Sequence, residues 1–379
     1  MNLYRTKPYI PEADKDSIMS NWKDVLDTGM FIQGKYVEEL ESEFATMCNT
    51  KYAIATNSGA TALEIALRAT GIENKKFLVP TQTFVASVSA IIRSNNIPKI
   101  TDVDLDSQCL NLEIIKENID ETVAGVMLVH MAGMITPDYF EIKKFCDEKG
   151  LIIIEDAAHA VGASIDNVPA GNLGLAGCFS LFATKIITSG EGGMITTNDQ
   201  KFARRCKLLR NHGMQKNVDI FLPGIDFGVT CTYASSNYRM PELSAVLGIS
   251  QIKRAKEFVD KRIELANLYN KFITNDNIIK PTISDNIRMS YWQYIIKIKD
   301  IQRTERVLIC KRLLEEFKIP TANAYWPACH SQPAFKKYVK GRVYPNAKKL
   351  LSQHIALPMY CEMSKKQIKY VAETLNKIV

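Results

Sequence analysis

The chain has 379 residues, of which 46% are hydrophobic and 23% are charged, and its formal net charge is +7. This is the composition of a globular protein long enough for two domains, and it excludes fibrous and largely disordered proteins. Lysines and arginines are scattered without a basic tail, so we expect no binding to nucleic acid.

Targeting segments and cysteine chemistry are likewise not expected. The segment 1–11 lacks the apolar core of a signal peptide, and no later run approaches the roughly 18 apolar residues of a membrane span. We therefore expect a cytoplasmic protein that does not bind membranes. The nine cysteines include no Cys-x-x-Cys pair, so we expect reduced, mostly structural thiols and no metal site.

Short apolar runs alternate with amphipathic segments through the first half of the chain. Strands are predicted over 52–56, 77–80, 99–103, 125–129 and 151–155, with helices that include 62–69 and 139–149. Such alternation indicates a parallel sheet covered by helices on both faces. The run Leu151–Ile154 has no polar face, which is typical of a central strand. Asp156 follows at its carboxyl end, where open α/β sheets bind ligands.

The second half predicts a further strand and a second, smaller domain. A strand over 194–197, a basic helix over 200–211, a helical stretch over 241–273, a strand over 291–298, a loop over 325–333 and a closing helix over 364–378 follow in order. We predict an α/β protein with a large domain, residues 1–245, built on a mostly parallel sheet. A small C-terminal α+β domain, residues 246–379, completes it.

The residues around Asp156 and Lys185 carry the chemistry. Asp156 ends an apolar strand, and Lys185 stands between Ser180 and the turn Gly190–Gly193. A pyridoxal 5′-phosphate (PLP) site needs a lysine to hold the aldehyde as a Schiff base and a carboxylate to keep the pyridine nitrogen protonated. A lone lysine is more often a solvated surface residue, but both residue types occur here in suitable contexts.

A second motif, Ser58-Gly59-Ala60-Thr61, predicts a seat for a phosphate group. Glycine lets the backbone turn closely, and the free N–H groups of the helix that follows attract an anion. A glycine before a helix is more often only part of a turn, so this motif indicates a phosphate site only together with the other motifs.

Seven blocks in order carry a resemblance to a known family. They are Asn57–Leu63, Pro80 with Thr83–Ala86, Glu155–His159, Phe179–Ser180 with Thr184–Lys185, Gly190–Gly193, Arg210–Gly213 and Asn237–Met240. Over nearly its whole length the chain resembles the DegT/StrS family of PLP-dependent nucleotide-sugar aminotransferases. The resemblance implies an aspartate-aminotransferase-like large domain (fold type I).

The resemblance also implies roles for individual residues. The implied cofactor-binding residues are Gly59, Ala60, Thr61, Phe84, Asp156, His159, Ser180, Lys185 and Asn237, with Lys185, Asp156 and His159 catalytic. Phe84 is expected flat against the pyridine ring, His159 at the phenolic oxygen or ring edge, and Ser180 at the phosphate. The family usually has threonine at the position of Ala60, so the hydroxyl of Thr61 is displaced by one place.

Two further residues are implied in binding and assembly. Asn237 is expected to reach the phosphate of a neighbouring subunit's cofactor, so that a homodimer shares its active sites. The family's usual Gly-Tyr before this block is Ser235-Ser236 here. His330, in the loop 325–333, matches a loop that lines the sugar pocket in relatives. A nucleophilic pair of Cys329 and His330 is not expected, because neighbours in sequence rarely face one another.

The expected reaction follows from the family. L-glutamate would donate its amino group, leaving pyridoxamine 5′-phosphate, which passes the nitrogen to a nucleotide-linked 3- or 4-keto-6-deoxyhexose for an amino sugar of a surface polysaccharide or glycan. Lys185 would act as general base and acid. Two alternatives stay open: a catalytically silent PLP-binding regulator, and a sugar dehydratase, which is disfavoured because dehydratases of the family carry histidine in place of Lys185.

Overall fold

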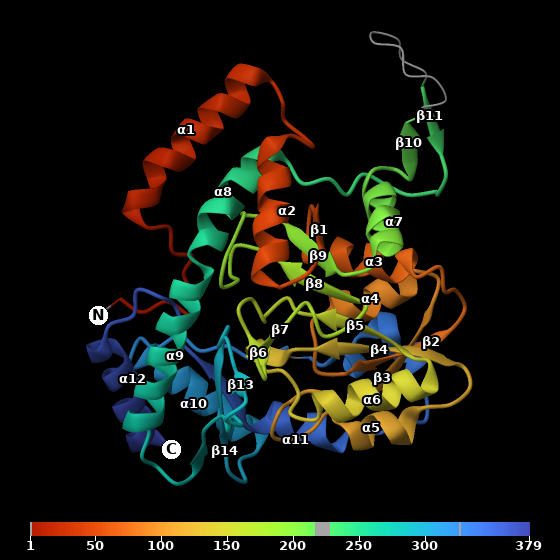
Figure 1. Ribbon diagram of the computed structural model, residues 1–379. Coiled ribbons are helices and arrows are strands. Elements are labelled where there is room, and N and C mark those ends of the chain that lie inside the picture. Colours follow the sequence, from red (N-terminus) through yellow and green to blue (C-terminus); the bar gives the residue numbers. More distant parts are fainter. Residues whose placement is uncertain (1, 217–227, 326) are drawn as a thin grey trace.

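A seven-stranded sheet forms the centre of the large part of the molecule (Figure 1). The computed structural model describes residues 2–216, 228–325 and 327–379, so Trp326 of the predicted loop lies outside the described residues. In spatial order the strands are β1 (Tyr52–Thr56), β9 (Gly193–Thr197), β8 (Ala176–Ser180), β5 (Ile152–Asp156), β4 (Val123–Val129), β2 (Lys76–Pro80) and β3 (Ile97–Thr101). The strands from β8 to β3 run parallel, and β9 pairs antiparallel with both β8 and β1. The predicted α/β class and mostly parallel sheet are confirmed.

An apolar core lies on each face of this sheet. One face carries α3 (Gly59–Ala69), α4 (Val85–Arg93) and α7 (Gln200–Arg210), and the other carries α2 (Lys35–Met47), α5 (Leu112–Asn118) and α6 (Tyr139–Lys149). Successive residues of a strand point to opposite faces, so Ile153 of β5 enters one core and Ile154 the other. This explains why the 151–155 run has no polar face, and β5 is indeed the middle strand.

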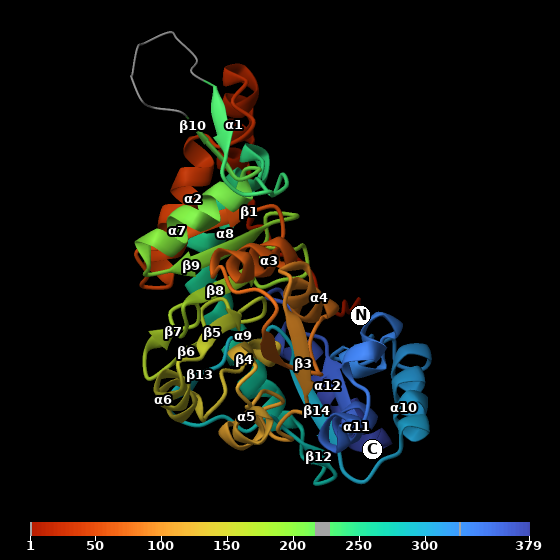
Figure 2. The same cartoon turned by 90° about the vertical axis from the view of Figure 1, so that its right-hand side faces the viewer.

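The smaller part is a three-stranded antiparallel sheet with helices. It comprises β12 (Ile278–Ile279), β14 (Tyr294–Ile298) and β15 (His354–Leu357), with α9 (Ala255–Phe272), α10 (Arg303–Glu315), α11 (Pro345–Gln353) and α12 (Lys365–Ile378). Figure 2 shows α10, α11 and α12 grouped together to the right of the strands of the large sheet. The short helices η2 (Cys329–Ser331) and η3 (Pro333–Tyr338) follow α10 in the chain, and η3 packs against β3 of the large sheet.

Helix α8 (Glu242–Lys253) leads directly into α9 and joins the two parts (Figure 1). It packs on α2 and on α1 (Glu12–Thr28), whereas α9 packs on α12. The boundary that we predicted between residues 245 and 246 falls within α8, and the division of the chain into two domains stays a prediction.

Short elements complete the described chain. They are β6 (Ser164–Ile165), β7 (Val168–Pro169), β10 (Met214–Lys216), β11 (Val229–Cys231), β13 (Ile287–Arg288) and η1 (Met131–Gly133). Strand β13 pairs with β6, so the segment that leads to β14 is attached to the loop that follows β5.

The largest difference from the predicted boundaries occurs at β14, which begins at Tyr294 rather than Tyr291. Tyr291 has a left-handed backbone, with φ of 49°. The carbonyl oxygens of Tyr291 and Trp292 accept hydrogen bonds from the buried Arg262 guanidinium at 3.1 and 3.3 Å, so they make no strand ladder. The β3 strand likewise begins two residues before the predicted 99–103 run.

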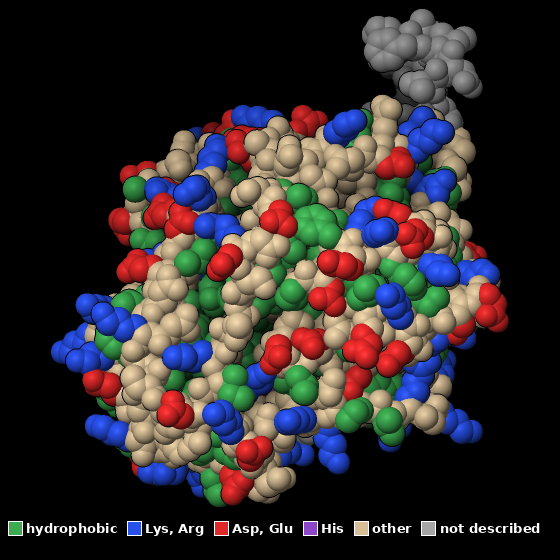
Figure 3. Space-filling model, turned by 60° about the horizontal axis from the view of Figure 1, so that its bottom comes forward, with side chains coloured by type: hydrophobic (Ala, Val, Ile, Leu, Met, Phe, Trp, Pro, Cys, Tyr) green, Lys and Arg blue, Asp and Glu red, His purple; other side chains and the backbone are tan. Residues whose placement is uncertain are grey.

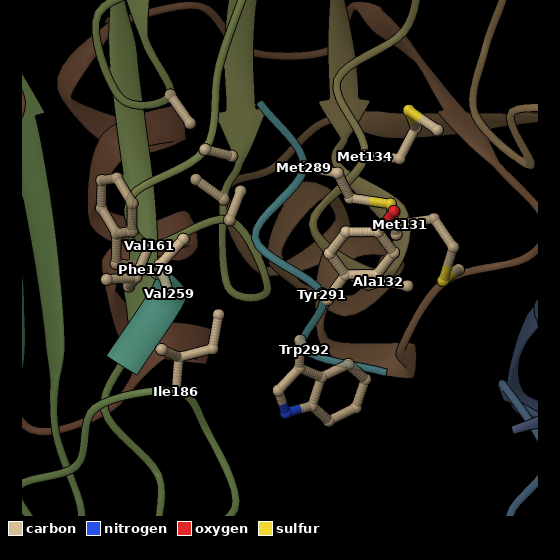
Figure 4. Packing of buried hydrophobic residues seen from close by; sticks show 14 of the residues in the cluster. Met131, Ala132, Met134, Val161, Phe179, Ile186, Val259, Met289, Tyr291 and Trp292 are labelled. Atoms are coloured by element: carbon tan, nitrogen blue, oxygen red, sulfur yellow. The ribbon is translucent and has the colours of Figure 1, made fainter. Parts of the chain in front are cut away.

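A cluster of methionines supports the segment before β14. Met131 and Met134, which follow β4, belong to the same core as Met289 and Tyr291, and Figure 4 shows Trp292 at the edge of this cluster. Methionine fills irregular gaps well. The packing holds Trp292 close to the ends of the central strands.

The surface and the helices give three further observations. Basic and acidic side chains both occur across the face shown in Figure 3. None of the helices in the described part of the chain has the length and apolar character that crossing a membrane requires. Within residues 2–216, 228–325 and 327–379, no cluster of three or more His, Cys, Asp or Glu side chains is arranged to hold a metal ion.

Candidate active site

A cavity of about 490 Å³ opens at the carboxyl ends of β4, β5 and β8. Its volume is in the range of small-molecule sites. Seven of the predicted site residues line it: Gly59, Ala60, Phe84, Asp156, His159, Ser180 and Lys185. The fold therefore brings together residues that are separated by more than a hundred positions in the sequence.

Lys185 lies in the turn after β8 with its ammonium group in the cavity. Its Nζ is 4.2 Å from the centroid of the Trp292 ring, and among the described residues it makes no hydrogen bond or ion pair. Burial lowers the pKa of Lys185 to about 8, against the opposing effect of the Asp156 carboxylate. About a tenth of this amine is therefore neutral, and so nucleophilic, at pH 7, far more than for an ordinary lysine.

Asp156 is the last residue of β5 and is 6% exposed. Its Oδ2 accepts a hydrogen bond from the Ser87 hydroxyl at 2.6 Å, and its Oδ1 accepts one from the Ala158 N–H at 3.2 Å. The Ser87 hydroxyl also lies 2.7 Å from that of Thr83. These contacts fix a buried carboxylate whose remaining lone pairs can bind a cationic group in the cavity.

The amino end of α3 forms an anion seat. Ser58 caps the helix by accepting a hydrogen bond from the Thr61 N–H at 3.2 Å, while the Thr61 hydroxyl donates to Asn57 at 2.8 Å. The first-turn N–H groups of Gly59 and Ala60 have no partner within the helix. A Cβ on Gly59 would lie 2.7 Å from the Ser180 Cβ, so glycine lets the Ser180 hydroxyl lie against this seat. The Thr61 hydroxyl is used in the cap.

The walls of the cavity are aromatic. Phe84 is 55% exposed, and its ring lies 5.8 Å from that of Tyr325. The His159 ring is buried and stacks on Trp292 with 3.8 Å between centroids. An exposed phenylalanine on a cavity wall can stack on a planar ligand.

Three of the predicted residues are not in the lining of this cavity: Thr61, whose hydroxyl is used in the helix cap, Asn237 and His330. Asn237 is exposed, and its Oδ1 accepts a hydrogen bond from the Arg239 N–H at 3.2 Å. The His330 Nδ1 lies 2.7 Å from the Thr81 hydroxyl, and the His330 ring stacks on Tyr344. The described chain therefore offers neither the Asn237 nor the His330 side chain to a ligand in the cavity, and their predicted roles remain predictions.

The lining also includes residues that we did not select from the sequence, among them Trp292, Gln293 and Tyr325. Gln293 is 7% exposed, and its Oε1 has no hydrogen-bond partner among the described residues. We interpreted 291–298 only as a strand. Polar and apolar residues do not alternate at the start of this segment, which could have indicated that Trp292 and Gln293 precede the strand.

Glu155 belongs to the motif but supports the fold beside the cavity. Fully buried, it accepts hydrogen bonds from the N–H groups of Gly171, Leu173 and Gly174 at 2.7 to 3.1 Å, and it contacts His130 Nε2 at 2.9 Å.

Glu155→Ala is therefore expected to lower the free energy of unfolding by at least about 3 kcal/mol, because it leaves several buried donors without an acceptor. Urea denaturation measures this change. Glu117→Ala, on the exposed face of α5, should change stability by less than about 0.5 kcal/mol. Equal effects of the two substitutions would contradict the structural role of Glu155.

Comparison with known proteins assigns the chain to the aminotransferases. The model of the DegT/DnrJ/EryC1/StrS aminotransferase family matches residues 12–376, and the chain therefore belongs to this family. The resemblance that the seven blocks carry is confirmed, and so is the expectation of a transaminase.

Individual relatives are similar over nearly the whole chain. The GDP-perosamine synthase of Escherichia coli O157:H7 is 30% identical over 347 residues, which are 91% of this chain and 90% of that protein. Among solved structures, the Helicobacter pylori aminotransferase PseC, involved in the biosynthesis of pseudoaminic acid, matches with a TM-score of 0.91 and 23% identity, covering 100% of this chain and 99% of that one. The sugar aminotransferase Spr1654 from Streptococcus pneumoniae in its PLP form matches with a TM-score of 0.89 and 22% identity, covering 100% and 98%.

Proposed function

We propose that the chain is a PLP-dependent aminotransferase that moves an amino group from L-glutamate to a nucleotide-linked keto sugar. The observation that carries this proposal is that the Lys185 amine and the Asp156 carboxylate line one cavity together with the anion seat of α3. The seat fits a phosphate because it offers the N–H groups of Gly59 and Ala60 together with the Ser180 hydroxyl. These donors can lie close together because Gly59 has no Cβ, which would lie 2.7 Å from the Ser180 Cβ. Membership in the family supports the same assignment.

Each residue has a defined task towards this cofactor. Gly59, Ala60 and Ser180 bind its phosphate, and the Asp156 carboxylate holds the proton on its ring nitrogen. Phe84 covers one face of its ring. When bound, the cofactor supplies an aldehyde that accepts the amino group and a ring that accepts electrons from the substrate carbon.

Lys185 both binds the cofactor and moves the proton. With a pKa of about 8, its Nζ is neutral often enough near neutral pH to attack an aldehyde. Once released, the same amine is placed to take a proton from the substrate carbon and return it.

The acceptor is proposed as a 3- or 4-keto-6-deoxyhexose linked to UDP, dTDP or GDP. A screen of such keto sugars with L-glutamate, read by the mass of the amino-sugar product, tests this choice. We expect transfer to at least one nucleotide sugar and none to free cyclitols or amino-acid aldehydes. Cofactor binding without any amino product would instead favour a silent regulator, and loss of water from the sugar would favour a dehydratase.

We further propose that two copies of the chain share their active sites through Asn237. The exposed side chains of Phe31, Ile32 and Leu243 support this, because the Phe31 carbonyl oxygen accepts a hydrogen bond from the Glu242 N–H and so holds the three together. Contiguous exposed apolar side chains of this kind mark interaction surfaces. Asn237, a few residues before Leu243 in the sequence, is exposed as well.

Co-expression of Lys185→Ala and Asn237→Ala subunits tests this sharing. A hybrid dimer would contain one site with both residues intact, so about a quarter of all sites should bind the cofactor tightly by subunit counting. Spectroscopic titration with PLP counts these sites. If the mixture has no more tight sites than the two parent proteins, Asn237 does not act across a dimer interface.

A further inference from the structure

Three stacked rings form one wall of the cavity, and they come from separate parts of the chain. His159 follows β5, Trp292 precedes β14, and Tyr325 lies in the loop after α10. The centroid of His159 lies 3.8 Å from that of Trp292 and 5.5 Å from that of Tyr325, with interplanar angles of 12° and 14°. The Trp292 indole N–H donates to the Thr184 carbonyl at 2.8 Å, which ties the stack to the Lys185 turn.

Hydrogen bonds fix the protonation of His159. Its Nδ1 accepts a hydrogen bond from the Ala132 N–H at 3.3 Å, so this nitrogen carries no hydrogen. Burial, together with the nearby Lys185 ammonium and His130, holds the pKa of His159 well below its usual value, so the ring is neutral. The one ring hydrogen is therefore on Nε2, which lies 2.5 Å from the Tyr325 hydroxyl oxygen.

This assignment decides the direction of the bond to Tyr325. The His159 Nε2–H donates, the Tyr325 oxygen accepts, and the phenolic hydrogen of Tyr325 is left to point elsewhere. Burial, the Asp156 carboxylate and Cys329 raise the pKa of Tyr325 well above its usual value, so this hydroxyl keeps its hydrogen. Tyr325 lines the cavity, whose contents are the available acceptor.

Tyr325 has an unfavourable backbone conformation that the surrounding loop maintains. Its φ of 59° is left-handed, which is uncommon for a bulky residue and persists where the surroundings impose it. The Ala324 N–H donates to the buried His354 Nε2 at 2.8 Å, and the buried Arg306 guanidinium binds the Asn323 side chain. The loop is thus fixed from behind, and the hydroxyl is aimed before any ligand binds.

We propose that Tyr325, rather than His159, donates the hydrogen bond to an oxygen of the bound ligand at this wall, and that His159 acts behind it as a positioning residue. The proposal rests on the proposed function, because it takes the phenolic oxygen of the cofactor as the acceptor. The chain Ala132 to His159 to Tyr325 is a property of the protein alone and can be tested without the cofactor.

The first measurement uses protein free of cofactor with ¹⁵N-labelled histidine. The signal of His159 is identified among the five histidines by its loss in His159→Gln. We expect a neutral ring with hydrogen on Nε2 throughout pH 6 to 8, and a clear shift of that Nε2–H signal in Tyr325→Phe but not in the control Tyr338→Phe. A charged ring, hydrogen on Nδ1, or an unchanged signal in Tyr325→Phe would overturn the proposal.

The second measurement adds PLP and follows the pH at which the visible absorbance of the bound cofactor changes. Removing a donor from an oxygen anion disfavours the anion, so Tyr325→Phe should raise this pH by about one unit. His159→Gln should raise it less, because the glutamine amide can still donate to Tyr325. The reverse order of the two shifts would contradict the proposal. Failure to bind PLP at all would contradict the proposed function and leave the histidine result standing.

Discussion

The Lys185→Ala variant is expected to lose about 1,000-fold or more in the rate of amino transfer, since it lacks the base that moves the substrate proton. The amine that this substitution removes lies 4.2 Å from the centroid of the Trp292 ring, and burial lowers its pKa to about 8. Single-turnover kinetics with L-glutamate measure the loss.

A matched control separates this effect from a general loss of positive charge. Lys201→Ala removes an exposed lysine at the start of α7 that does not line the cavity. It should transfer the amino group at the normal rate. If Lys185→Ala kept more than about a tenth of the normal rate, proton transfer would have to come from another group.

The second large effect is expected for Asp156→Asn. The amide can still accept the Ser87 hydroxyl bond, so the fold should be preserved, but it no longer carries the charge that holds a proton on the ring nitrogen. We expect turnover to fall by about 100- to 1,000-fold, the usual effect of removing one preorganised electrostatic contact. Steady-state kinetics measure the fall, and circular dichroism checks the fold.

Asp16→Asn, on the exposed face of α1, is the control for this change and should leave turnover intact. Both substitutions remove one negative charge, so the ratio of the two rates measures the effect of removing that charge from the cavity. A turnover of Asp156→Asn within threefold of the control would show that Asp156 has only a structural part.

The predicted strands match every strand of the central sheet except β8, which was not predicted, because these strands are apolar runs buried on both faces. The 151–155 run has no polar side, and the structure places it as the middle strand β5. The start of β14 could not be predicted, because the left-handed Tyr291 and the hydrogen bonds from Arg262 are tertiary features. The residues near Tyr291 in the sequence do not indicate that the guanidinium of Arg262, which belongs to α9, binds this segment.

The residues of the site likewise fall into those that could be predicted from the sequence and those that could not. Asp156 and Lys185 could be selected from their places after apolar strands, whereas Ser180 was selected through the family resemblance. Trp292 and Tyr325 reach the cavity from the smaller part of the chain through packing and a strained loop. No spacing in the sequence records those approaches.

The most direct test of the account locates the bond between protein and cofactor. Purified protein is saturated with PLP, reduced with borohydride and digested, and the peptides are weighed by mass spectrometry. We expect the added mass on the peptide that contains Lys185, and on no other lysine in significant amount. Its absence from that peptide, or its presence mainly on another residue, would contradict the assignment on which the proposed function depends.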